Sequence, residues 1–219
     1  MCFSAGASFS SGVLLAFVGT ETLRKVHKPS QIAFAGIPLF FALQQFTEGV
    51  LWMAAAHAGY AGVQRTATYV FAIMAQVIWP LLIPLSMLLM EENRSRKRLL
   101  FALLGAGAAV ALYYSYRLWF YGIHAEISCR HISYHGAGLD FLNKTAIVFY
   151  LAATIISLFA SSIKRMYVLG IIMAISFVVS ALFYTQCLTS VWCFFAAVMS
   201  FAIFYMVRDA HKKFLFKAT

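Results

Sequence analysis

Seven stretches of mainly apolar residues follow one another along this chain, and their length constrains the fold more than any other feature. A helix needs about 20 such residues to cross the hydrocarbon core of a membrane. Charged residues make up only 11% of the chain, about half the share found in a soluble domain. We therefore predict an all-α, polytopic integral membrane protein with a single domain over residues 1–219, whose spans are approximately 5–22, 31–56, 66–90, 98–119, 142–163, 167–185 and 188–207.

The basic residues predict the orientation of these spans. The chain has 17 Lys and Arg against 7 Asp and Glu, an excess that in a soluble domain would suggest nucleic-acid binding. Positively charged loops of membrane proteins stay in the cytoplasm. We therefore predict an outward N-terminus, an inward C-terminus and no nucleic-acid partner, because 13 of the 17 follow spans one, three, five and seven, in clusters at Arg24–Lys28, Arg94–Arg98, Lys164–Arg165 and Arg208–Lys217.

Glu48 is the clearest ionisable residue inside a predicted span. It lies in the segment ALQQFTEGVLW, roughly 12 Å below the outer end of the second span at about 1.5 Å per residue. Gln44 and Gln45 precede it by about one turn and Trp52 follows it by one turn, so helical geometry gathers these side chains on one face. Since a charge in hydrocarbon costs several kcal/mol, we interpret Glu48 either as a ligand, proton or metal site or as a residue that fixes helix packing.

The third span has a second polar centre at a similar depth. In the segment IMAQVIWPLL, Gln76 and Trp79 lie beside Pro80. Proline has no N–H, so we expect Pro80 to leave the carbonyl of Gln76 without its helical hydrogen bond. Gln76 and Trp79 therefore join Glu48 as candidate pocket residues, although a kinked helix is also a common structural device.

The four cysteines all lie on the predicted outer side or in the outer part of the spans. Cys129 lies in the longest loop, about residues 120–141, and Cys187 lies in the turn between the last two spans. In an oxidising compartment these two could form a disulfide. Cys2 and Cys193 remain as thiols that could face the pocket, although a buried cysteine is usually just a small apolar residue.

The long outer loop also has histidines that could bind a metal. The stretch from Cys129 to His135 alternates as a strand would, while His131 and His135 also have the spacing of one helical turn. The spacing matches no standard zinc pattern, and exposed histidines are more often solvated. We keep Cys2, Cys193, His131 and His135 as weak candidates for metal ligands, and no motif in the chain requires a cofactor.

Four segments together resemble an uncharacterised family of bacterial seven-helix membrane proteins that begin with MCFSA. They are MCFSAGASF, IPLFFALQQFTEGVLW, AQVIWPLLIPL and SVWCFFAA, and the similarity extends over nearly the whole chain. The resemblance implies a compact seven-helix bundle in the bacterial inner membrane, and it brings no known reaction. Its matching polar positions are Cys2, Gln45, Glu48, Gln76, Trp79 and Cys193; the loop segment HISY also matches, with Arg130 where a second histidine is expected.

Three classes of function are compatible with this sequence. The first is a sensor or transport-like protein that binds a small molecule or ion from outside, in a polar pocket around Glu48, with Trp52 extending its lining. The second is an intramembrane enzyme or redox protein that uses Cys2 or Cys193 as a thiol, with or without a metal. The third is a structural accessory subunit whose polar residues fix its packing. The partner common to all three is the lipid bilayer.

Overall fold

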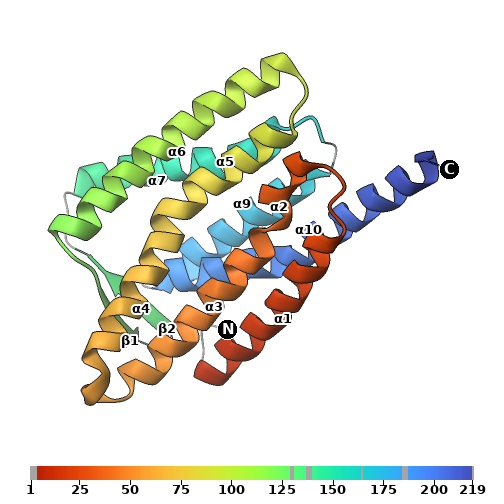
Figure 1. Ribbon diagram of the computed structural model, residues 1–219. Helices are drawn as coiled ribbons and strands as arrows, with labels where there is room; N and C mark the ends of the chain where they lie inside the picture. The colour runs from red at the N-terminus through yellow and green to blue at the C-terminus, as the bar shows by residue number, and fades with distance from the viewer. Residues whose placement is uncertain (1–3, 129–130, 137–139, 164, 184–186, 219) are drawn as a thin grey trace.

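The computed structural model describes residues 4–128, 131–136, 140–163, 165–183 and 187–218 (Figure 1). Helices cover each of the seven apolar stretches within these ranges, which confirms the all-α prediction. They are α1 (Ala5–Arg24), α2 (Ile32–Ala35), α3 (Ile37–Ala55), α4 (Ala61–Ile73), α5 (Trp79–Met90), α6 (Arg94–Phe120), α7 (Asp140–Leu151), α8 (Ser157–Ala160), α9 (Met166–Phe183) and α10 (Leu188–Ala218). Two π-helical turns, Met74–Ile78 and Ala152–Ile156, join α4 to α5 and α7 to α8, and short 3-10 turns occupy Pro29–Gln31 and Ala58–Tyr60.

Within the described ranges, five helical segments are long and apolar enough to cross a membrane. They are Ala61–Met90, Arg94–Phe120, Asn143–Ala160, Met166–Phe183 and Ser190–Ala210. Large apolar side chains also point outward: Leu112 and Leu182 are each 72% exposed. Such a surface is unfavourable in water and fits contact with lipid, so the molecule has the helices and the surface of a membrane protein.

A β-hairpin follows α6 and lies at one end of the helices. Strands β1 (His124–Ser128) and β2 (His131–His135) pair antiparallel, with His124 opposite His135. The hairpin packs near the ends of α3 and α4 (Figure 1), where Gln64 Nε2 donates to the carbonyl of Ala125 at 3.1 Å. Of the two geometries that the sequence left open for this segment, the strand is the one adopted.

The π-helical turn before Pro80 changes which carbonyl lacks a helical partner. Trp79 donates its N–H to the carbonyl of Met74, five residues back, so in the same register the carbonyl of Ala75 is paired with Pro80, which has no N–H. The hydroxyl of Tyr150 on α7 donates to Ala75 instead, at 2.6 Å. The prediction that Pro80 frees the carbonyl of Gln76 assumed the four-residue pairing of an α-helix, whereas the pairing next to Pro80 spans five residues and the carbonyl with an outside donor is that of Ala75.

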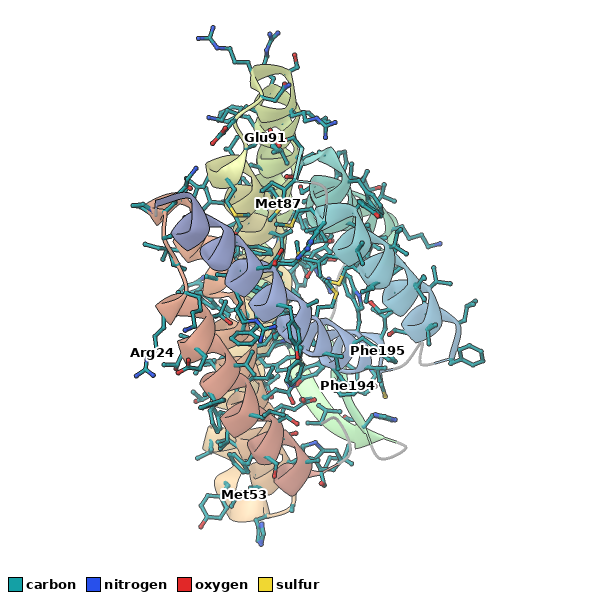
Figure 2. The ribbon with its side chains drawn as sticks, turned by 90° about the vertical axis from the view of Figure 1, so that its right-hand side faces the viewer. Arg24, Met53, Met87, Glu91, Phe194 and Phe195 are labelled. Atoms are coloured by element: carbon teal, nitrogen blue, oxygen red, sulfur yellow. The ribbon has the colours of Figure 1, made fainter. Side chains whose placement is uncertain are left out.

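The described parts of the four basic clusters lie at the end of the bundle opposite the hairpin. Three contacts bring the segments together: Lys28 lies 3.8 Å from the carboxylate of Glu92, Glu91 accepts hydrogen bonds from Ser162, and Arg165 pairs with Asp209 at 2.8 Å. Figure 2 shows Glu91 near this end and Met53, from the last turn of α3, at the other. The loops that follow α1, α5 and α8 thus meet one another and the last part of α10.

Glu91 is the residue that ties two of these loops together. Its side chain is 1% exposed, and its carboxylate accepts hydrogen bonds from the N–H groups of Glu92, Asn93 and Ser162, at 3.1, 3.0 and 2.6 Å, and from the hydroxyl of Ser162 at 2.7 Å. Burial by itself would raise the pKa of Glu91, but the four donors stabilise the charged form more and lower the pKa below its ordinary value.

Candidate functional site

The inner face of α3 has three polar side chains in the bundle interior. Gln44 and Glu48 are 0% exposed and Gln45 is 1% exposed. A polar side chain buried in this way is unfavourable unless it has hydrogen-bond partners, and a charged one more so. The partners of these three residues therefore define the site.

Two of the three side chains pair with α10 and α5. The hydroxyl of Ser190 donates to Glu48 Oε1 at 2.5 Å, and Gln44 Nε2 donates to the sulfur of Cys193 at 3.1 Å. Gln44 Oε1 in turn accepts from Trp79 Nε1 at 2.9 Å. Gln44 and Glu48 are one turn apart on α3, and Ser190 and Cys193 are one turn apart on α10, so two helix faces meet in register.

Gln45 differs from its neighbours in having no partner. Both polar atoms of its amide are buried, and neither makes a hydrogen bond with any residue that the structure describes. It lies one turn before Glu48, so the two side chains are neighbours on the helix. An unsatisfied buried donor or acceptor costs about 1–3 kcal/mol, and the amide therefore requires an explanation.

The β-hairpin covers the end of the bundle nearest to this polar cluster. The ring of Tyr134 stacks on Phe71, with centroids 4.6 Å apart and planes 5° apart, and both belong to a small core that includes Cys193. Trp52, half-buried, packs against the hairpin core as well, and its indole N–H has no partner among the described residues. Trp52 thus lies between Glu48 and the hairpin, as an extension of the site.

Gln76 and Trp79 lie on two sides of Cys193. Trp79 lines a small cavity of about 20 Å³ with Cys193. Gln76 lines a larger one, of about 170 Å³, whose wall includes Tyr114 and again Cys193. Cys193 is therefore where the polar cluster on α3 and the cavity beside Gln76 meet.

Of the remaining predicted site residues, the structure describes Cys187, His131 and His135. Cys2 and Cys129 lie outside the described residues, so the Cys129–Cys187 disulfide and the position of Cys2 stay predictions. Cys187 is buried, and its sulfur lies 3.8 Å from the hydroxyl of Ser133.

The histidines of the hairpin lie on one strand. His131 and His135 are both on β2, which separates their backbones by about 13 Å. His131 is 7% exposed, and burial lowers its pKa because the charged imidazolium loses solvation. Over the part of the chain that the structure describes, no group of three or more His, Cys, Asp and Glu side chains could hold a metal ion.

The family comparison covers almost the entire chain. The model of DUF6629, a family of unknown function, matches residues 1–216. The chain belongs to DUF6629. This confirms the resemblance to an uncharacterised family. No curated protein and no solved structure matches the chain, so the membership in DUF6629 assigns neither a reaction nor a ligand.

The sequence analysis did not identify Ser190 as part of this DUF6629 site, and it placed Gln44 on the face of Glu48 without choosing it as a site residue. Ser190 precedes Cys193 by three residues in the segment SVWC, and that spacing could have indicated a shared helix face. Gln44 makes the contacts with α5 and α10, whereas the sequence favoured its neighbour Gln45. No pattern distinguishes two adjacent glutamines until the rotation of α3 is known.

Proposed function

We propose that this protein crosses the bacterial inner membrane as a seven-helix bundle and binds a small polar molecule or ion at Glu48, as a sensor or transport-like protein. The observation that carries the proposal is the buried amide of Gln45, which has no partner among the described residues and lies one turn from the buried carboxyl of Glu48. A bound ligand that hydrogen-bonds this amide would remove its unfavourable desolvation.

The arrangement around Glu48 suits a small ligand with both donors and acceptors. Ser190 donates to Oε1 of Glu48, so this hydrogen bond holds the carboxyl group in place. The Gln45 amide offers one donating and one accepting atom. Because Glu48 and Gln45 are buried, the ligand would be enclosed, and its entry would require the hairpin or a neighbouring helix end to move.

The first test compares Glu48 with Gln45 and Gln44. We expect Glu48→Gln to fold and to lose the ligand, because the amide keeps an acceptor for Ser190 but changes the charge. We expect Gln45→Leu to unfold at the wild-type temperature or above it, since it removes two unsatisfied buried atoms. Gln44→Leu, the matched control, should lower stability because it breaks the bonds to Trp79 and Cys193.

The measurement is thermal unfolding in detergent across a library of ions and polar solutes. A ligand at a hundred times its Kd stabilises the wild type by about 2.7 kcal/mol, and this gain should vanish in Glu48→Gln and Gln45→Leu. Glu126→Gln, on the exposed part of the hairpin, should keep it. A strongly destabilised Gln45→Leu, together with a wild type that no solute stabilises, would assign these residues to packing.

The seven-span topology rests on the arrangement of the basic loops. Lys28, Glu91, Ser162 and Arg165 come from successive odd-numbered loops, and their contacts lie at one end of the bundle. An odd number of crossings between the termini agrees with this arrangement, with α1 and α3 as the two spans of lower hydropathy. The positive-inside rule then makes this end cytoplasmic and the hairpin end external.

Reporter fusions test this topology directly. Fusions after Lys28, Arg98, Arg165 and Thr219 should all report the cytoplasm, and a fusion within the hairpin should report the periplasm. Two or more periplasmic signals among the first four would contradict the seven-span arrangement.

A second candidate function is an intramembrane thiol- or metal-dependent enzyme or redox protein. The observation in its favour is that the sulfur of Cys193 accepts a hydrogen bond from Gln44 while Cys193 also lines two cavities. Elemental analysis and intact mass of purified protein distinguish this candidate, because bound metal or a modified thiol would be detected directly.

A further inference from the structure

Two adjoining cavities lie between α6 and the π-helical turn Met74–Ile78. The first, of about 280 Å³, reaches the hairpin end, where Arg117 and Gly136 line it. The second, of about 170 Å³, ends at Trp192 and Cys193. Gln76 and Tyr114 line both, so the two volumes are neighbours at these side chains, and together they are called the passage.

Three polar side chains along this passage make no hydrogen bond to a described residue. Tyr114 is 8% exposed, and its hydroxyl makes no hydrogen bond within the described part of the chain. The indole N–H of Trp192 is buried and also unpartnered there. The side-chain amide of Gln76 likewise has no hydrogen bond to a described residue. Tyr114, Trp192 and Gln76 can thus each donate a hydrogen bond into this space, and Tyr114 and Gln76 can also accept one.

The charge of the lining points the same way. Arg117 lies at the hairpin end of the passage, with its guanidinium 5.9 Å from the ring centres of Tyr113 and Tyr114 and a hydrogen bond to the carbonyl of Gly136 at 3.1 Å. Neither cavity has a carboxylate among its described lining residues. A positive charge and several donors favour an oxygen acceptor or an anion over a cation.

The size and walls of the inner cavity fit a single ring. A cavity of about 150 Å³ lined by apolar side chains is large enough for benzene, and this one has about 170 Å³. The rings of Phe177 and Trp192 form part of its wall, 5.2 Å apart in an edge-to-face arrangement. Flat apolar compounds pack well against such walls.

We propose that this passage binds a small cyclic compound with a carbonyl or carboxylate oxygen, whose ring lies against Phe177 and Trp192 and whose oxygen accepts from Tyr114 and Gln76. The passage shares Gln76 and Cys193 with the site predicted around Glu48, but neither Glu48 nor Gln45 is among its described lining residues, so the proposal does not depend on ligand binding at Glu48. It would admit its ligand from the hairpin end, past Arg117.

The test uses three probes of one size that differ in their polar group: benzoate, benzamide and benzylamine. Binding to the detergent-purified full-length protein is measured by isothermal titration and by thermal shift. We expect benzoate and benzamide to bind and the cationic benzylamine to bind at least about tenfold more weakly, because it offers no acceptor. No binding by any of the three, or equal binding of benzylamine, would overturn the proposal.

Tyr114→Phe is the decisive variant because it removes only the hydroxyl. That hydroxyl has no hydrogen bond to lose within the described residues, so the variant should fold as the wild type does and bind benzoate about tenfold more weakly. Gln76→Leu should weaken binding by a similar factor. It replaces Tyr114→Phe as the test variant if Tyr114→Phe does not fold. Tyr113→Phe, which loses its 2.9 Å bond to Asn143 outside the inner cavity, should keep wild-type affinity. Unchanged binding in both Tyr114→Phe and Gln76→Leu would contradict the site.

Discussion

Replacing Gly107 by alanine is expected to destabilise the protein by about 3 kcal/mol or more, the upper end of the effects of overpacking. A Cβ atom at Gly107, on α6, would lie 1.9 Å from the carbonyl oxygen of Pro80 and 2.9 Å from its carbonyl carbon, both on α5. Backbone atoms cannot rotate away as a side chain can, so the two helices would have to separate. Unfolding of the purified variant in mixed detergent and SDS micelles measures the loss.

Gly105 provides the matched control on the same helix. A Cβ at Gly105 would meet nothing within 4 Å, and alanine is a better helix former than glycine by about 1 kcal/mol. Gly105→Ala should therefore be as stable as the wild type or slightly more stable. A Gly107→Ala protein with wild-type stability would show that α5 and α6 do not approach as closely as described.

The contrast between these two glycines shows how far the sequence could predict helix packing. The segment Gly105–Ala109 reads GAGAA, and such a run of small residues favours close approach to a neighbouring helix. It did not indicate which glycine is needed, because that depends on which face of α6 meets α5. The sequence did not indicate the partner either, since the Pro80 carbonyl belongs to a helix that follows a π-helical turn.

The positions of the helices could be predicted, but their rotations could not. The apolar stretches coincide with helices because length and hydropathy depend on composition alone. The rotation of α3 depends instead on α1: a Cβ at Gly49 would lie 2.9 Å from the ring of Phe9, and one at Gly12 would lie 3.0 Å from Phe46. These close contacts turn Gln44, and not Gln45, towards Trp79 and Cys193.

The polar cluster was predictable only in part for the same reason. Glu48 was identified because a carboxyl group within an apolar span is unfavourable, so that its presence indicates a functional or structural role. Its hydrogen-bond donor, Ser190, is 142 residues away in the chain and resembles the serines found throughout the spans. The division of Gln76 and Trp79 between two cavities depends on where Cys193 lies between them, which is a property of the assembled bundle.

Glu91 was not identified from the sequence because the residues around it are typical of an exposed loop. The segment EENRSRK after the third span is rich in charged and polar residues, as a solvated turn is. Nothing in that pattern distinguishes Glu91 from Glu92, whose side chain is 89% exposed. The difference arises because Ser162, 71 residues later, presents both its N–H and its hydroxyl to Glu91.

Replacing Glu91 by alanine is accordingly expected to lower the free energy of unfolding by about 3 kcal/mol or more. Hydrogen bonds to a charged group contribute about 1.5–3 kcal/mol each. Four such bonds depend on this carboxylate. SDS titration of the purified variant measures the change.

Glu92→Ala is the control, because Glu92 is exposed and its contact with Lys28 is long, at 3.8 Å. Exposed ion pairs of this kind contribute about 0–1 kcal/mol, so Glu92→Ala should unfold almost as the wild type does. Equal stabilities of the two variants would contradict the role assigned to Glu91.

The same carboxylate should give the protein a specific response to acid. Because the pKa of Glu91 is lower in the folded protein than its ordinary value of about 4.5, the unfolded chain takes up this proton first as the pH falls. The stabilisation is therefore complete above about pH 4.5, decreases below it, and is lost once the pH passes the folded-state pKa. Unfolding measured between neutral pH and pH 3 should show this decrease in the wild type and in Glu92→Ala. The difference in stability between the wild type and Glu91→Ala should shrink over the same range, and a difference that stays constant down to pH 3 would mean that Glu91 is not charged in the folded protein.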